Sequence, residues 1–300
     1  MRERLSSLLV EAAKNDPKVI ILTGDHGYQL FDELRRVRPE QFLNCGVAEQ
    51  GMVGIAAGLA SQGFKPIVYG LAAFIPMRTL EQIKLDVCFT NLPVVFLGDG
   101  AGLVYSTLGA SHHCSEDIAV LRPLPNISIY SPCDATEMER SFKEALALKG
   151  PSYIRIGKGD RPSCSSPQAK DYQFQFTVPT TSEDFALVST GSMVAVCTEI
   201  AEDFKIDCIS VRRIKPVPDV LLACLGVFRT LIVVEEHSKH GGLYSMIAEQ
   251  FADRPGPRIH SIALKDKFAD KCGSWQFALS EHGLDDSSIR QKVNEIVNLS

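Results

Sequence analysis

The sequence predicts an α/β protein of two domains, each a largely parallel sheet flanked by helices. Short β-branched runs alternate with longer helical patterns along most of the chain, which is typical of parallel sheets that helices cover on both faces. A segment rich in Pro, Ser, Thr and Gln interrupts this alternation at 158–183. The chain has 300 residues, enough for about two domains. We therefore expect a first domain at 1–160, a linker at 161–183 and a second domain at 184–300.

The elements follow from the run lengths, taken in chain order. Val19-Ile-Ile-Leu22 is a β-branched run that a Thr-Gly-Asp-His-Gly turn ends, and similar runs recur between longer helical patterns. The first domain is expected to hold strands at 19–22, 66–69, 93–97, 127–130 and 152–156, and helices at 47–61 and 137–149. The second is expected to hold strands at 185–189, 208–211 and 230–234, and helices at 193–204, after Gly241-Gly242 and at 287–297.

Composition and charge exclude several classes of partner and location. The formal net charge is −5 without a long basic run, which favours neither nucleic acid nor a membrane surface. Residues 1–16 carry charges where a secretory signal needs an apolar core, and no run reaches the ~18 apolar residues of a membrane helix. The nine cysteines form no CxxC pair. Reduced thiols in a cytoplasmic protein are expected.

One acidic residue stands out because of the helix that follows it. Glu49 lies in Gly46-Val-Ala-Glu-Gln50, directly before a helical pattern rich in Gly and Ala. A carboxylate at a helix N-terminus is by itself explained by capping and the helix dipole. The many small residues at 51–58 indicate in addition that another backbone or subunit packs closely against this helix.

These residues resemble a known family. Gly-Val-Ala-Glu-Gln, with Gly-Ile-Ala-Ala-Gly-Leu-Ala after it, resembles the pyrimidine domain of transketolases and deoxyxylulose-phosphate synthases, especially transketolases whose halves are separate chains. The resemblance continues in the same order along the whole sequence. It implies that Glu49 binds N1′ of the aminopyrimidine of thiamine diphosphate and so promotes loss of the proton at C2. Gln50, beside it, becomes a second candidate for cofactor binding.

The resemblance assigns a cofactor-stacking segment to 69–82. Phe74 is the candidate for stacking on the aminopyrimidine, because a flat ring on a flat heterocycle gains both area and geometry. Arg78 is similar to an arginine of split transketolases and is a further cofactor-binding candidate. Leu71 stands where classical transketolases often carry a second Phe.

Four residues are candidates for contact with substrate. His112, in a Ser-His-His…Glu-Asp-Ile-Ala segment, resembles the histidine that touches sugar hydroxyls and can move a proton near neutral pH. His26 and Asp99 are expected beside it. Lys158 stands where the family has a phosphate-binding arginine and would grip phosphate more loosely, with Arg155 or Arg161 as compensation.

One departure concerns the acceptor. Classical transketolases have Asp-Gly-Pro before the Thr-His that matches Ser111-His112, whereas this chain has Leu108-Gly-Ala-Ser111. The lost carboxylate contacts an acceptor hydroxyl in the family. A deoxygenated or otherwise modified acceptor is therefore expected.

No metal site is expected in this chain. Gly98-Asp-Gly100 is not followed by the Asn-Asn that completes the Mg²⁺ and diphosphate site of thiamine enzymes. The pair His112 and His113 has no third ligand at a helical spacing, which argues against zinc. The resemblance implies that Mg²⁺ and the diphosphate are held largely by a partner chain, in an α2β2 heterotetramer.

The second domain carries a Val-Glu-Glu…Gly-Gly turn that is similar to the transketolase C-terminal domain. Glu235, Glu236 and Gly241 are expected to be structural. His237 and His240 are candidates for the pocket mouth.

The predicted function is that of one subunit of a thiamine-diphosphate transketolase, which transfers a two-carbon ketol unit from a ketose or ketose phosphate to an aldehyde. Two alternatives stay open. One is a decarboxylating subunit like deoxyxylulose-phosphate synthase or the β subunit of 2-oxo-acid dehydrogenase E1. The other is a non-catalytic assembly subunit. A self-contained nucleotide-binding module is disfavoured, because no G-x-G-x-x-G follows a strand.

Overall fold

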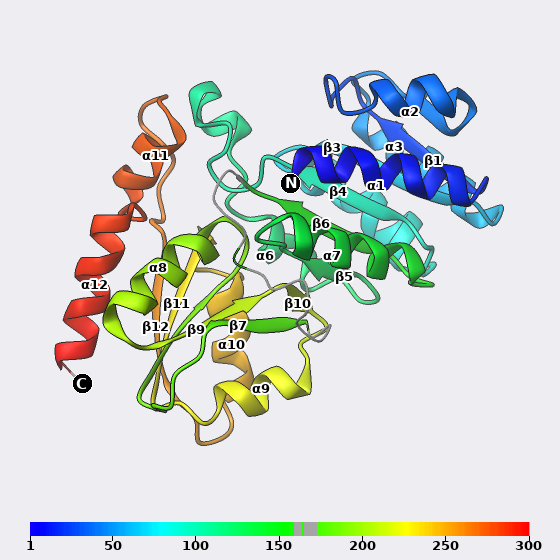
Figure 1. Ribbon diagram of the computed structural model, residues 1–300. Helices are drawn as coiled ribbons and strands as arrows, with labels where there is room; N and C mark the ends of the chain where they lie inside the picture. Colours follow the sequence, from blue (N-terminus) through cyan, green and yellow to red (C-terminus); the bar gives the residue numbers. More distant parts are fainter. Residues whose placement is uncertain (159–163, 165–172, 300) are drawn as a thin grey trace.

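The computed structural model describes residues 1–158, 164 and 173–299. Two sheets, each flanked by helices, lie side by side and are joined by segments that cross between them (Figure 1). The predicted fold class is confirmed. Part of the expected linker, together with Arg161, lies outside the described residues.

The first sheet has seven strands in the order β10-β5-β6-β4-β3-β1-β2. All neighbours are parallel except β10, which runs antiparallel to β5 and comes from the second half of the chain. Their bounds are β1 Val19–Thr23, β2 Phe42–Asn44, β3 Lys65–Leu71, β4 Val95–Asp99, β5 Ser128–Tyr130, β6 Ser152–Ile156 and β10 Arg213–Lys215. A strand of the second half thus completes the edge of the first sheet.

The second sheet has five strands in the order β12-β11-β8-β9-β7. All pairs are parallel except β7 with β9. Their bounds are β7 Phe174–Val178, β8 Phe185–Ser189, β9 Asp207–Val211, β11 Thr230–Ser238 and β12 Arg258–Leu264. β7 lies within the range expected to be linker, so the sheet begins earlier than its sequence pattern indicates.

Helices cover both sheets, and their apolar faces form three large clusters. One face of the first sheet packs against α1 and α7. The other face, together with α3, α9 and α10, forms a cluster that continues from one domain into the other. α8, α11 and α12 cover the second sheet on the side away from that shared cluster (Figure 1). The helix bounds are α1 Arg2–Asn15, α2 Asp32–Val37, α3 Glu49–Ser61, α4 Ile75–Arg78, α5 Leu80–Gln82, α6 Asp117–Leu121, α7 Ala135–Ala147, α8 Val194–Phe204, α9 Asp219–Leu225, α10 Leu243–Phe251, α11 Trp275–His282 and α12 Asp286–Leu299.

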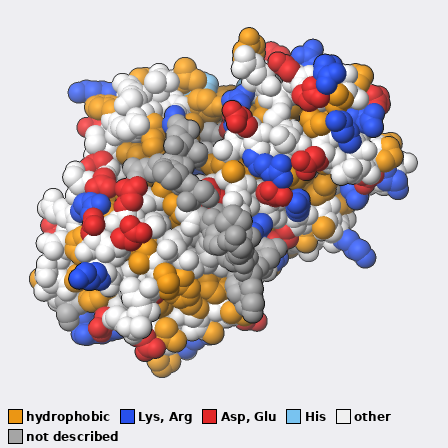
Figure 2. All heavy atoms as spheres, viewed as in Figure 1, with side chains coloured by type: hydrophobic (Ala, Val, Ile, Leu, Met, Phe, Trp, Pro, Cys, Tyr) orange, Lys and Arg blue, Asp and Glu red, His pale blue; other side chains and the backbone are white. Residues whose placement is uncertain are grey.

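The helix α1 was not expected from its sequence, which is rich in Arg, Glu and Ser. Leu5, Leu8, Leu9 and Ala12 are buried, and their spacing of three and four residues makes one apolar stripe on an otherwise polar helix. No helix in the described part of the chain is both long and apolar enough to span a bilayer. Charges of both signs are interspersed over the face seen in Figure 2.

Candidate active site

Glu49 begins α3 and lies almost buried, with 5 % of its surface exposed. Its Oε1 accepts a hydrogen bond from Arg78 Nη1 at 3.1 Å and lies 3.9 Å from His26 Nε2. Among the described residues, the second carboxylate oxygen, Oε2, has no hydrogen-bond partner. One edge of this acid is therefore left for a further donor.

Phe74 and Arg78 lie together next to Glu49, in the turn and short helix α4 that follow β3. The Arg78 guanidinium carbon is 3.8 Å from the centre of the Phe74 ring, so the planar cation stacks on the aromatic face. Gln50 is exposed, and its Nε2 donates to the Arg78 carbonyl oxygen at 3.0 Å. Gln50 thus fixes the backbone that carries Arg78.

His26 and His112 complete a cluster around the Phe74 ring. The ring centres of His112 and His26 lie 5.3 and 5.9 Å from that of Phe74. His112 belongs to the 3-10 turn η4, Ala110–His112, which follows Gly109 at a φ of 80° that favours glycine. Ser111 Oγ and His112 Nδ1 are 3.0 Å apart.

These rings open onto a cavity of about 390 Å³. Asp99, at the end of β4, lines it, and Tyr69 and Tyr105 both donate to Asp99 Oδ2, at 2.7 and 3.0 Å. Burial and the neighbouring Asp99 raise the pKa of both tyrosines, which stay protonated donors. The lining residues are Arg2, Asp25, His26, Gly27, Tyr28, Tyr69, Leu71, Phe74, Asp99, Tyr105, Leu108 and His112.

Comparison with known proteins assigns the family. The transketolase pyrimidine binding domain matches residues 1–162, and the transketolase C-terminal domain matches residues 176–288. The chain belongs to the transketolase family.

Two relatives and one solved structure define its place in that family. The chain is 31 % identical over 306 residues to one subunit of the apulose-4-phosphate transketolase of Phocaeicola vulgatus, covering 99 % of this chain and 97 % of the relative. It is 33 % identical over 280 residues to 1-deoxy-D-xylulose-5-phosphate synthase of Lawsonia intracellularis, covering 89 % of this chain but only 44 % of that enzyme. A solved structure named "Split gene transketolase, inactive beta4 tetramer" matches with a TM-score of 0.86 and 29 % identity, over 98 % of this chain and 96 % of that one. The chain is the β subunit of a split, transketolase-type transferase.

In this transketolase subunit the two neighbouring histidines lie in different cavities. His112 faces Phe74, whereas His113 lines a cavity between the two domains. The pattern His-His does not reveal this, because the turn after η4 sends consecutive side chains to opposite sides of the loop. No group of three or more His, Cys, Asp or Glu within the described residues could hold a metal ion.

The two basic residues at the end of β6 differ in their surroundings. Arg155 is 2 % exposed, and its Nε donates to both oxygens of the fully buried Asp117, at 2.9 and 3.0 Å. Its Nη2 donates to the Glu236 carbonyl oxygen at 2.7 Å. Arg155 is thus part of the joint between the domains and does not line the cavity at His112. Lys158 is half-buried and is not among the residues that line the cavity at His112.

Glu235, Glu236 and His237 are three consecutive buried residues of the transketolase C-terminal domain beside this joint. Glu235 accepts hydrogen bonds from the backbone N–H groups of Leu243 and Tyr244, at 2.7 and 3.0 Å, and so caps α10. Glu236 accepts from the Leu103 backbone N–H at 2.6 Å and from the Trp275 indole at 2.8 Å.

His237 is fully buried between the domains. Its Nε2 accepts from the Ala119 backbone N–H at 3.4 Å, and its Nδ1 donates to the Ser238 carbonyl oxygen at 2.6 Å. With Glu236 it therefore links the loop after β4 and the start of α6 to the second sheet.

Proposed function

We propose that this chain binds the aminopyrimidine of thiamine diphosphate through Glu49 and Phe74, and that a partner chain holds the diphosphate and Mg²⁺. The main support for the proposal is that the nearly buried carboxylate of Glu49 lies beside Phe74, an aromatic ring that faces a cavity. The family is thiamine-diphosphate dependent, and the bound cofactor supplies a carbon nucleophile that accepts the two-carbon unit.

The residues present fit a planar ring that donates hydrogen bonds. Arg78 supports this, because its flat guanidinium donates to Glu49 while it stacks on Phe74. These are the two interactions that an aminopyrimidine would make, so the guanidinium acts as a stand-in for the ring. Binding the cofactor would require Arg78 to turn aside, with Gln50 still holding its backbone.

Each residue of the site, whether it lines this cavity or lies beside it, then has a proposed task. Glu49 binds the pyrimidine nitrogen and shares a proton with it, which an amide at this position could not do. His112 and His26 donate to, or accept from, substrate hydroxyls. Asp99, oriented by two tyrosine hydroxyls, accepts from a further hydroxyl. Lys158 is proposed to attract a substrate phosphate at the edge of the site.

The exposed face of α3 supports a partner chain at this site. Apart from the neighbouring backbone of α3 itself, a Cβ atom added to Gly54 or Gly58 would meet no atom of the described residues within 4 Å. Val47 and Ile55, on or beside the same face, are 71 and 43 % exposed. A smooth apolar surface beside Glu49 suits a second backbone that approaches closely and brings the diphosphate site.

We propose an α2β2 heterotetramer, because the relative solved as a tetramer of β chains alone is described as inactive. The first domain is proposed at 1–160 and the second at 184–300 together with β7, which shortens the linker expected at 161–183. None of the nine cysteines is in a disulfide, which supports a reducing, cytoplasmic location.

The proposed reaction is transfer of a two-carbon ketol unit from a ketose or ketose phosphate to an aldehyde. Leu71 and Leu108 line the cavity, which favours an acceptor with fewer hydroxyls than a common sugar. The similarity to a subunit of an apulose-4-phosphate transketolase supports a ketose phosphate such as apulose 4-phosphate as the sugar partner. The similarity to deoxyxylulose-phosphate synthase keeps pyruvate decarboxylation as the second candidate.

Reconstitution with the partner chain tests the proposal. The chain would be mixed with a subunit that contains Gly-Asp-Gly…Asn-Asn and given a ketose phosphate or pyruvate, with aldehyde transfer and CO2 release measured. We expect transfer without CO2, and Glu49→Gln should lower turnover by roughly 10²–10⁴-fold. Glu202→Gln, an exposed change on α8, is the matched control. Unchanged turnover in Glu49→Gln would favour an assembly subunit, and CO2 release would favour the decarboxylating alternative.

A further inference from the structure

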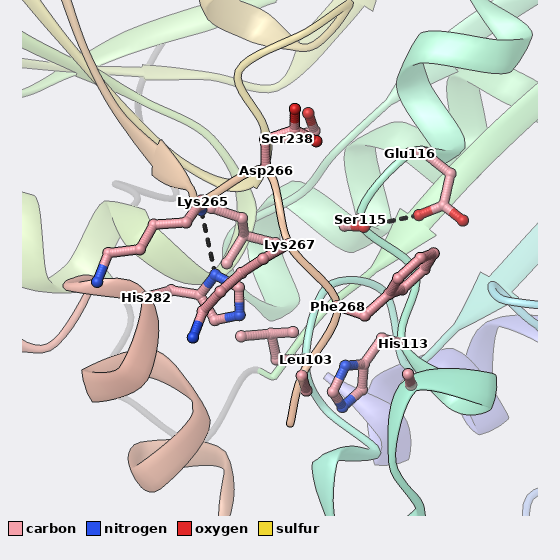
Figure 3. Close-up of a pocket in the computed structure, with 13 residues that line it drawn as sticks. Leu103, His113, Ser115, Glu116, Ser238, Lys265, Asp266, Lys267, Phe268 and His282 are labelled. Carbon is pink, nitrogen blue, oxygen red and sulfur yellow. Dashed lines mark hydrogen bonds between the residues drawn. The ribbon is translucent and has the colours of Figure 1, made fainter. Parts of the chain in front are cut away.

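A second cavity, of about 270 Å³, lies between the two domains (Figure 3). Its walls come from the loop after β4, the ends of β11 and β12, the segment after β12 and the end of α11. It shares no lining residue with the cavity at Phe74, and the turn η4 separates the two. Its size suits a small metabolite rather than a nucleotide.

One wall holds a histidine whose hydrogen-bonding state is fixed. His282 is 3 % exposed, and its Nδ1 accepts the Lys265 backbone N–H at 3.1 Å. The proton of the neutral ring therefore lies on Nε2, a donor that the structure directs toward the cavity (Figure 3). Burial, and then the charges of Lys267 and Lys265, lower the pKa of His282.

The opposite wall holds a histidine with an unmet hydrogen bond. His113 Nε2 is shielded from solvent and has no partner among the described residues. Leaving such an atom unpaired costs roughly 1–3 kcal/mol. Figure 3 shows the nitrogen-bearing sides of His113 and His282 turned toward each other across Leu103. A polar molecule between them would satisfy both rings.

Charge is divided between the two walls. Lys267 lies beside His282, and its ammonium meets Asp270 only in an exposed contact of 3.4 Å, which holds it weakly. On the His113 side, Ser115 Oγ donates to Glu116 Oε2 at 2.8 Å, and Oε1 can accept from a ligand. One wall thus donates to an anion, and the other accepts from hydroxyl groups.

We propose that this interdomain cavity binds a small phosphorylated polyol, with its phosphate at His282 and Lys267 and its hydroxyls at His113 and Glu116. A simple anion would leave Glu116 Oε1 without a donor and would be repelled by the carboxylate. A hydroxyl can both donate and accept, so it suits His113 in either tautomer. Phe268, 86 % exposed at the rim, covers the carbon chain.

The test measures binding to the full-length chain without cofactor or partner, so it is independent of the proposed catalytic function. The histidine ring signals would be followed by NMR during titration with glycerol 3-phosphate, inorganic phosphate or glycerol. We expect glycerol 3-phosphate to shift the His113 and His282 ring signals saturably, with an affinity roughly tenfold higher than that of inorganic phosphate. Glycerol should cause no shift.

Variants at partly exposed positions avoid the risk that the chain fails to fold. Lys267→Met should lower the affinity for glycerol 3-phosphate and for inorganic phosphate several-fold. Glu116→Gln should lower the affinity for glycerol 3-phosphate, whereas the affinity for inorganic phosphate should stay the same or rise. Lys239→Met, an exposed lysine outside this cavity, is the control and should change neither. Three outcomes would each overturn the proposal. The two phosphates could bind with equal affinity, or Lys267→Met and Lys239→Met could have equal effects. The third outcome is that the shifts centre on His112 and His26.

Discussion

Two buried residues at the domain joint should make stability depend on pH in opposite directions. Burial raises the pKa of Glu235 from its ordinary 4.5 to about 7, and it lowers that of His237 from 6.5 to about 4. Glu235 Oε2 and His237 Nδ1 are only 3.9 Å apart. Both residues lie on one face of β11, and the pH ranges over which they affect stability, 4.5–7 and 4–6.5, largely overlap.

The sign follows from proton binding. Between pH 4.5 and 7 the folded protein keeps the Glu235 proton that the unfolded chain has lost, so this residue lowers stability as pH rises. Between pH 4 and 6.5 the unfolded chain protonates His237 and the folded protein does not, so this residue raises stability as pH rises. Each pKa difference corresponds to on the order of 3 kcal/mol.

The perturbations are Glu235→Gln and His237→Gln, and the assay is thermal unfolding followed by circular dichroism from pH 4 to 8. Relative to the unmodified chain, Glu235→Gln should gain stability as pH rises and His237→Gln should lose it. The difference across the range is roughly 6–12 °C for a chain of this size. Glu202→Gln controls for the loss of a surface charge. The melting temperature of each variant is compared with that of the unmodified chain. If these differences stay constant with pH, or change in the same direction for both variants, Glu235 and His237 do not have the opposite effects described above.

Three further predictions concern the joint and the site. Arg155→Met should lower the free energy of unfolding by about 3–5 kcal/mol in urea titrations, because it leaves the buried Asp117 carboxylate without its cation. The double variant Asp117→Leu, Arg155→Met should recover much of this loss. A loss of under about 1 kcal/mol in Arg155→Met would contradict the prediction. Arg78→Gln should tighten the binding of thiamine diphosphate to the reconstituted complex roughly fivefold, measured by calorimetry. The reason is that the cofactor no longer has to displace Arg78 from Glu49 and Phe74, contacts that together are worth about 1 kcal/mol. Weaker binding would mean that Arg78 holds the cofactor. Tyr105→Phe removes one of two donors to Asp99 and should raise the KM for the aldehyde several-fold more than it lowers kcat, whereas an unchanged KM would remove Asp99 from acceptor recognition.

Sequence alone could assemble the group around Glu49, because its members lie in local patterns. Glu49 and Gln50 begin one helix, and Phe74 and Arg78 occupy the turn after one strand. A parallel sheet brings such turns to one edge, so their meeting follows from the fold class. The alternation of strands and helices was likewise enough to predict the fold.

The rest depended on contacts between distant segments. Arg155 has the features of a free cation at a strand end, and its partner Asp117 lies 38 residues away. Tyr69 and Tyr105 had no motif to mark them; the alignment of Leu71 with Asp99 in neighbouring strands is the signal that places Tyr69 near Asp99. β10 is three residues long and pairs across domains, which no local pattern encodes.

The role of Glu49 on the pyrimidine ring is tested most directly by hydrogen–deuterium exchange at C2 of thiamine diphosphate. The exchange rate would be measured in the reconstituted complex by quenched-flow NMR. With Glu49→Gln we expect exchange slowed by at least ~100-fold while the cofactor stays bound. Exchange at the unmodified rate, with the cofactor bound, would show that this carboxylate does not act on the pyrimidine ring.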